Sequence, residues 1–284
     1  MGFATVKEYV DALDGGRFVQ SSIRKVPSQA STAGMWVDLS MAPGNPKPQY
    51  YASTPFEAAT LTGLEGIYHG GDKSPAEQFV TELNLTTPTA GLVGRYVLAD
   101  YLLYYPFVEL DSLDAQVMDN TTTLPRYTDG DGVRVVMVAQ APTTGGEVFT
   151  FEYVNQDGAT RTSPSVTCGT TSVPIASTIT QQAATTASQG LFLPLAQGDT
   201  GVRRINSVTF TTGGGGLAAL VLVRPLVDAT VFEANTPSEW SAVTQRVALP
   251  RVYDGAYLGL LMQCSATVAA GTLSGRINYA WTEG

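Results

Sequence analysis

The chain has 284 residues, of which 44% are hydrophobic and only 14% are charged, with a formal net charge of -9. This apolar content excludes a disordered chain and is enough to bury one large core or two smaller ones. The acidic balance and the scattered basic residues, whose closest group is Arg203-Arg204, argue against a nucleic-acid partner. No stretch approaches the ~20 apolar residues of a membrane span, so we also expect no membrane partner.

The N-terminus predicts a short amphipathic helix. Thr5 and Glu8 have the spacing of a capping box, and Gly15-Gly16 ends the pattern. An apolar stripe would lie on one face of this helix, formed by Val6, Tyr9, Val10 and Leu13. About three turns of helix are marginal in isolation, so the stripe has to pack on the same chain or on a neighbouring subunit. The segment lacks the basic and then apolar layout of a signal peptide, so we expect no export.

Residues 17–53 show little periodicity and predict an extended arm. Residues 42–49 hold three prolines, which favour an extended path and supply few donors to a sheet. Long irregular arms typically lie across another surface. We therefore expect this arm to bind a partner, and we expect deletion of residues 1–53 to abolish attachment while the C-terminal domain stays folded. The proposed partner-binding residues are Trp36, Pro43, Pro46, Pro48, Tyr50 and Tyr51.

Three further segments precede the β-rich part of the chain. Residues 54–64 are compatible with a short helix, and Ser74-Pro75-Ala76-Glu77 predicts a second capped helix that ends by Leu85. Residues 96–110, YVLADYLLYYPFVEL, are the most apolar and aromatic run. Their composition favours a buried strand, whereas their apolar spacing also fits a helix ended by Pro106, so both remain open.

The remainder predicts antiparallel strands. Residues 133–139, 148–154 and 159–167 read as a three-stranded meander, and the aromatic face of the second strand, Phe149, Phe151 and Tyr153, should be buried. Residues 172–189 read as polar strand or ordered loop. The glycines 213–216 predict a hairpin tip, and the apolar residues 217–223 suit the middle of a sandwich.

These elements predict a mainly β fold. We expect one or more antiparallel sandwich or jelly-roll-like domains, with an extended N-terminal arm and a few short helices. The expected division places the helix, arm and short helices in an attachment region, residues 1–94, and the sandwich in residues 95–284.

No motif in the sequence specifies catalysis, a cofactor or a metal, so we expect a protein that is not an enzyme. Glu109, Asp111 and Asp254 are candidate glycosidase carboxylates, but sequence does not supply the spacing that catalysis needs. Residues 129–132, DGDG, lack most of a calcium loop and predict a tight turn instead. A single histidine, His69, makes no zinc site alone. Cys168 and Cys264 are expected to be buried thiols, with a disulfide as the alternative.

Several words of the chain resemble a family of tailed-bacteriophage virion structural proteins encoded with capsid genes. The words are DYLLYYPFVELD (100–111), DNTTTLPRYTDGDGV (119–133), FLPLAQGDTGVRRINSVTF (192–210), LVLVRPL (220–226), LPRVYDGAYLGL (249–260), WVDLSMAPGNPKPQYYAS (36–53) and GIYHGG (66–71).

The resemblance implies a capsid decoration or cement protein that binds the major capsid protein. It further implies a homotrimer on the capsid surface of the virion, assembled in the host cytoplasm. A tail, neck or baseplate component and a host-glycan-binding virion module are the alternatives, and exposed aromatic residues on the sheet would suit the latter.

Overall fold

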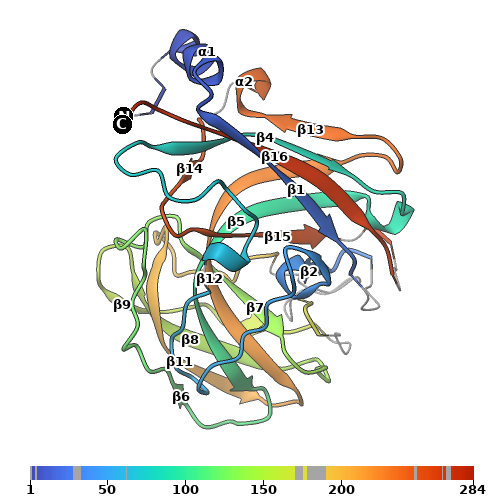
Figure 1. Ribbon diagram of the computed structural model, residues 1–284. Coiled ribbons are helices and arrows are strands. Elements are labelled where there is room, and N and C mark those ends of the chain that lie inside the picture. Colours follow the sequence, from blue (N-terminus) through green and yellow to red (C-terminus); the bar gives the residue numbers. More distant parts are fainter. Residues whose placement is uncertain are drawn as a thin grey trace.

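The computed structural model describes residues 2–3, 5–27, 33–61, 63–169, 175–177, 190–245, 248–263, 265–266 and 270–284. Three antiparallel sheets account for nearly all of its regular structure, which confirms the mainly β prediction (Figure 1). The helical elements are short: α1 (Val6–Asp14), α2 (Ala242–Gln245) and the 3-10 turns η1 (Leu39–Met41), η2 (Gly63–Glu65) and η3 (Ala90–Leu92). No helix in these described ranges is long and apolar enough to cross a bilayer.

The first outer sheet has six strands and joins the two ends of the sequence. Its order is β13 (Ser238–Ser241), β4 (Gln78–Thr86), β16 (Leu273–Trp281), β1 (Phe18–Lys25) and β3 (Gly44–Asn45), with β14 (Arg251–Val252) also paired to β4. Residues 18–25 of β1 pair in register with residues 280–273 of β16. The N- and C-terminal ends consequently lie side by side (Figure 1).

The central sheet is built on two long strands. Its order is β2 (Trp36–Asp38), β15 (Tyr257–Gln263), β5 (Gly94–Glu109), β12 (Leu217–Val231) and β7 (Arg134–Ala139). The second outer sheet has the order β10 (Val166–Thr167), β8 (Val148–Asn155), β11 (Val202–Thr212) and β6 (Gln116–Val117), with β9 (Thr160–Thr162) paired to β8.

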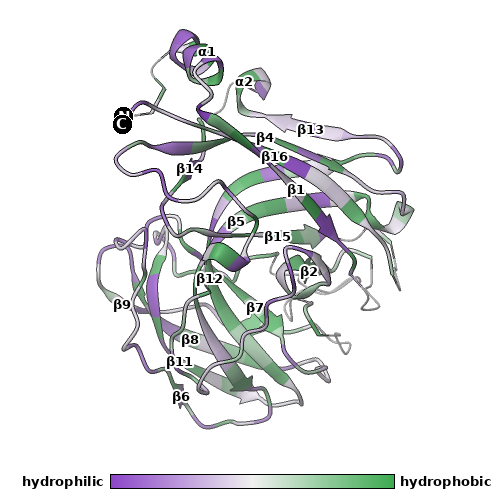
Figure 2. Ribbon diagram, in the orientation of Figure 1, coloured by the Kyte–Doolittle hydropathy of each residue, from purple (hydrophilic) through white to green (hydrophobic). Residues whose placement is uncertain are grey.

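The central sheet is buried on both faces because each face lines a different core. Figure 2 shows its strands as the most continuously hydrophobic part of the fold. Successive side chains of a strand point to opposite faces, so alternate residues of β12 enter alternate cores. Ala219, Val221 and Val223 belong to the first core, and Ala218, Leu220 and Leu222 to the second. The predicted central position of residues 217–223 is confirmed.

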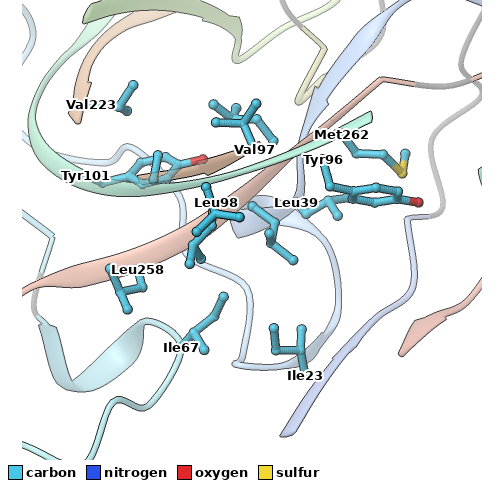
Figure 3. Packing of buried hydrophobic residues seen from close by; sticks show 14 of the residues in the cluster. Ile23, Leu39, Ile67, Tyr96, Val97, Leu98, Tyr101, Val223, Leu258 and Met262 are labelled. Atoms are coloured by element: carbon cyan, nitrogen blue, oxygen red, sulfur yellow. The ribbon is translucent and has the colours of Figure 1, made fainter. Parts of the chain in front are cut away.

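The first core lies between the six-stranded sheet and the central sheet. Figure 3 shows Ile23 of β1, Leu39 of η1, Leu98 of β5 and Leu258 of β15 packed within it. The second core contains Phe149, Phe151 and Tyr153 of β8, all essentially inaccessible to solvent, as predicted for that aromatic face. The run 96–110, left open between helix and strand, forms most of β5.

Two predicted N-terminal elements differ in the structure. The first helix is confirmed, and the Thr5 hydroxyl accepts a hydrogen bond from the Glu8 N–H at 3.2 Å. The helix predicted after Pro75 is wrong, because these residues lead into strand β4, which pairs with β16 along one edge and with β13 along the other. Residues 54–61 form isolated bridges instead of a helix. Pairing with distant strands overrides the local capping signal in the first case.

Two predicted turns connect different sheets. Strand β7 pairs with β12 and not with β8, so the meander is wrong at its first strand, whereas β8 does pair with β9 and β10. Residues 213–216 join β11 to β12, which lie in separate sheets, so the glycine run is not a hairpin tip. A Cβ at Gly214 would lie 2.1 Å from Glu147 Oε1, so close packing explains this glycine. The 129–132 turn is confirmed, with positive φ at Gly130 and Gly132.

The expected boundary at residue 94 does not separate two sheets. Strands β1, β3 and β4 precede it and share one sheet with β13, β14 and β16, which follow it. Residues 1–53 include β1 and β3, so their removal would leave one edge of β16 without its partner β1. Cys264 and residues 172–174 and 178–189 of the predicted polar segment lie outside the described residues.

Candidate partner-binding surface

The predicted arm divides into a buried half and an exposed half. Trp36 and Tyr51 are only 3% and 1% exposed, so they belong to the core of the chain and are not available to a partner. The Tyr51 ring packs against the Tyr104 ring of β5 at 5.2 Å between centroids. Pro43 and Tyr50 are exposed, and Pro46 and Pro48 are half-buried, so these four residues can contribute to a surface.

A buried carboxylate holds the arm on the central sheet. Asp38, at the end of β2, accepts hydrogen bonds from the Tyr101 hydroxyl of β5 at 2.8 Å, from the Ser40 N–H at 2.9 Å and from the Ser40 hydroxyl at 2.8 Å. The Tyr51 hydroxyl donates to its second oxygen. Burial raises the pKa of Asp38, and these hydrogen bonds act in the opposite direction. The aromatic residues of the arm and of β5 are therefore tied together through one side chain.

A buried lysine fixes the proline-rich turn of the arm. Lys25, the last residue of β1, donates from Nζ to the carbonyl oxygens of Ala42 at 3.1 Å and Pro46 at 2.7 Å. Burial lowers its pKa to about 8, although the nearby Asp38 charge opposes this shift. Both backbone carbonyls thus obtain a partner inside a segment that has few N–H donors of its own.

Lys25→Met is expected to remove a rise of stability with pH. The lysine has a pKa of about 8 in the folded chain and 10.5 ordinarily, so between these values the unfolded chain binds more protons. The free energy of unfolding should therefore rise with pH in this window, by at most about 1.4 kcal/mol per pH unit. Urea unfolding of wild type and Lys25→Met at pH 8, 8.75 and 9.5 measures both slopes. Equal slopes would contradict the assignment.

A hollow of about 400 Å³ lies beside the exposed half of the arm. Its lining comes from three places in the chain: residues 20–22 of β1, residues 45–47 of the arm, and residues 64–66 and 68 at η2. Leu64 and Tyr68 are 90% and 61% exposed, and Tyr50 nearby in sequence is 58% exposed. Lys47 and Glu65 form a salt bridge of 2.6 Å at the surface, which solvent screening makes weak.

Exposed apolar side chains are concentrated in this part of the sequence. Ten large apolar residues of the described chain are strongly exposed, and six of them precede residue 69. These six are Val6, Val10, Phe18, Tyr50, Leu64 and Tyr68. The apolar stripe predicted on α1 is thus only partly covered by its own chain. Exposed apolar side chains that gather into a patch mark interaction sites, so this part of the chain is the candidate for a partner-binding surface.

Strand β1, which lines the hollow, was not predicted from the sequence. Residues 18–25 read FVQSSIRK, and the inward-facing positions include Ser21 and Lys25. Ser21 donates from Oγ to the Tyr68 carbonyl, and Lys25 donates to the Ala42 carbonyl of the arm. Both polar side chains therefore have hydrogen-bond partners inside the fold. The apolar alternation that signals a strand is interrupted at these two positions, which left Val19 and Ile23 as a weak signal.

The candidate carboxylates lie at two separate places in the fold. Glu109 ends β5 and Asp111 follows it, whereas Asp254 precedes β15 and accepts a hydrogen bond from the Lys73 N–H at 2.9 Å. Tyr257 of β15 lies opposite Tyr101, and eight further residues of β5, about 26 Å of strand, lead to Glu109. All three carboxylates are solvent-exposed.

The remaining candidate residues have structural partners. His69 is buried, its Nδ1 lies 3.1 Å from Gln78 Oε1, and burial lowers its pKa. Cys168 is a buried free thiol whose pKa is raised by burial and by the Glu147 carboxylate. Among the residues that the structure describes, no group of three His, Cys, Asp or Glu side chains could hold a metal ion.

Comparison with known proteins returns distant structures alone. No protein-family model and no curated protein sequence matches the chain. The structure of the infectious bursal disease virus Gt strain aligns at 10% identity over 94% of this chain and 81% of that chain, with a TM-score of 0.19. The VP2 subviral particle of the same virus aligns at 10% identity over 93% and 80%, with a TM-score of 0.17. TM-scores this low establish no common fold.

Proposed function

We propose that this chain is a non-enzymatic structural protein of a virion, and specifically a decoration protein that binds the major capsid protein and stabilises the shell. The observation that carries the proposal is the concentration of exposed apolar side chains on α1, the start of β1, the arm and η2. The resemblance of the sequence to tailed-bacteriophage virion proteins supplies the identity of the partner.

The composition of the chain supports the same role. Only 14% of its residues are charged, so much of its surface lacks the charge that keeps monomers apart. A decoration protein is present in many copies, and modest interfaces then add up to a large stabilisation of the shell. We propose a homotrimer as the unit that attaches, at local threefold positions of the capsid.

Separation of heads from tails tests the proposal. Purified phage particles are dissociated, heads and tails are separated on a gradient, and the chain is quantified in each by mass spectrometry. We expect it in heads at a copy number comparable to that of a capsid subunit, and a free oligomer of about 90 kDa by light scattering, three chains of 30.0 kDa. Recovery in tails alone supports the tail, neck or baseplate alternative and overturns the proposal.

Leu64→Ser is expected to weaken binding to heads that lack the chain by about tenfold, because a large exposed side chain buried at an interface contributes 1–2 kcal/mol. Co-sedimentation with such heads measures the affinity. Leu113→Ser is the matched control, because Leu113 is also exposed but precedes β6 in the other outer sheet. Equal binding by both variants removes η2 from the interface.

A further inference from the structure

Within the described ranges, one edge of β1 has no paired strand along most of its length. Its other edge pairs with β16 at all eight residues, whereas β3 pairs only with Arg24 and Lys25. No described strand pairs with residues 18–23 on the β3 side. Sheet edges present a row of backbone donors and acceptors, and folded proteins usually cover or block them.

The contacts of β3 identify which backbone groups face the open edge. Asn45 donates from Nδ2 to the Ser22 carbonyl at 2.8 Å, and the Val26 N–H donates to the Pro43 carbonyl at 2.8 Å. Backbone groups alternate in direction along a strand, so the N–H and C=O of Gln20 also point to this side. An asparagine side chain thus already takes the place of a strand at one position.

The open edge borders the hollow described above. Gln20 and Ser22 line it together with residues 45–47, Leu64 and Tyr68. The stretch from Phe18 to Ser22 carries no lysine, proline or acidic residue, the side chains that ordinarily protect an edge. Exposed apolar side chains and unpaired backbone groups therefore face the same space.

We propose that an extended polypeptide segment of the capsid partner adds to the open edge of β1 as a further strand of the six-stranded sheet. This inference rests on the proposed function and specifies how the partner is held. Backbone N–H and C=O groups in alternation are matched by another backbone, so the occupant is a peptide in extended form. Its apolar side chains, two residues apart, contact Leu64 and Tyr68.

A partner segment fits this edge better than a second copy of the chain. Residues 45–47, Leu64 and Tyr68 line the hollow beside this edge. A second copy that paired edge to edge would bring its own residues 45–47, Leu64 and Tyr68 to the same place. A partner segment brings only its own backbone and side chains, so it needs less room at the edge.

Gln20→Pro tests the proposal. Proline removes the N–H that faces the open edge and places its ring there, while the bonds between β1 and β16 at the odd-numbered residues remain. We expect binding to heads that lack the chain to weaken by about tenfold or more, measured by co-sedimentation. Gln20→Thr keeps the N–H and is the matched control, with binding near that of wild type.

Hydrogen exchange of the wild-type chain gives a second readout that does not depend on how well Gln20→Pro folds. The Gln20 amide should exchange rapidly in the free chain and become protected on heads. If wild type binds heads but Gln20 stays unprotected and Gln20→Pro binds normally, strand addition is overturned while the proposed function stands. If wild type does not bind heads, the proposed function itself fails.

Discussion

Replacing Asp38 with alanine is expected to lower the free energy of unfolding by about 3–5 kcal/mol, the largest effect of any single change in the arm. The carboxylate accepts from the hydroxyls of Tyr51 and Tyr101 and from the backbone and side chain of Ser40, all of them buried. Alanine removes the acceptor that these buried donors share, and only the Ser40 and Tyr51 hydroxyls, 3.5 Å apart, have each other as a remaining partner. Urea unfolding monitored by tyrosine fluorescence measures the change.

Asp228→Ala is the matched control for this prediction. Asp228 lies in β12 and pairs with Arg95, but both side chains are about half exposed, so the ion pair contributes little. We expect a change within about 0.5 kcal/mol. Similar losses for Asp38→Ala and Asp228→Ala would contradict the view that the arm is held by a buried carboxylate.

Arg126→Met is expected to lower the free energy of unfolding by about 3–5 kcal/mol near pH 7, because it leaves the Asp100 carboxylate buried without its counter-charge. Arg126 donates to both Asp100 oxygens, at 2.8 and 2.6 Å, and its third nitrogen donates to the Gly255 carbonyl at 3.0 Å. One side chain thus connects β5 to the loop before β7 and to the loop before β15.

The pH dependence of this variant provides a further check. Burial already raises the pKa of Asp100 above its ordinary value of 3.8 in the wild-type chain, although Arg126 opposes this. Without Arg126 the folded-state pKa rises further, so the folded variant binds a proton that the unfolded chain does not. The stability difference from wild type should therefore narrow as the pH falls from 7 to 5. Asp100→Asn combined with Arg126→Met should recover most of the loss at pH 7, and an additive double variant would contradict the pairing.

The sequence predicted residues 217–223 as a strand buried on both faces, and the structure explains why. Residues 217–223 are apolar at every position because consecutive side chains serve two cores, and no other arrangement of a short strand tolerates such a run. The burial of the aromatic face of β8 was likewise predicted, because aromatic residues alternate with other residues along this strand. In both cases the deciding information lies within a few neighbouring residues.

The predictions that were wrong depended on partners far away in the sequence. The capping box at residues 74–77 is a sound local signal, but β4 gains more from pairing with β16, about 200 residues later. Strand β8 is the next strand after β7 in the sequence, yet β7 pairs with β12. Sequence patterns give the period of an element and not the identity of its neighbour.

Four of the six residues that the sequence assigned to a partner lie where a partner could reach them. Pro43, Pro46, Pro48 and Tyr50 do reach the surface, as a proline-rich arm would suggest. Trp36 and Tyr51 were assigned to a partner because large aromatic residues favour interfaces, but the same property favours cores. The polar residues that hold the arm, Lys25 and Asp38, gave no signal, because a buried charge is recognisable only from the groups around it.

The double-sided burial of the central sheet couples the two cores to each other. Along residues 218–223 of β12, successive side chains point alternately into the first core and into the second core. Melting either core would expose one face of a strand that the other core also needs, so we expect the two cores to unfold together. A partner that binds only the six-stranded outer sheet is therefore expected to raise the free energy of unfolding of the whole chain. The second outer sheet would be stabilised as well, although the partner does not contact it.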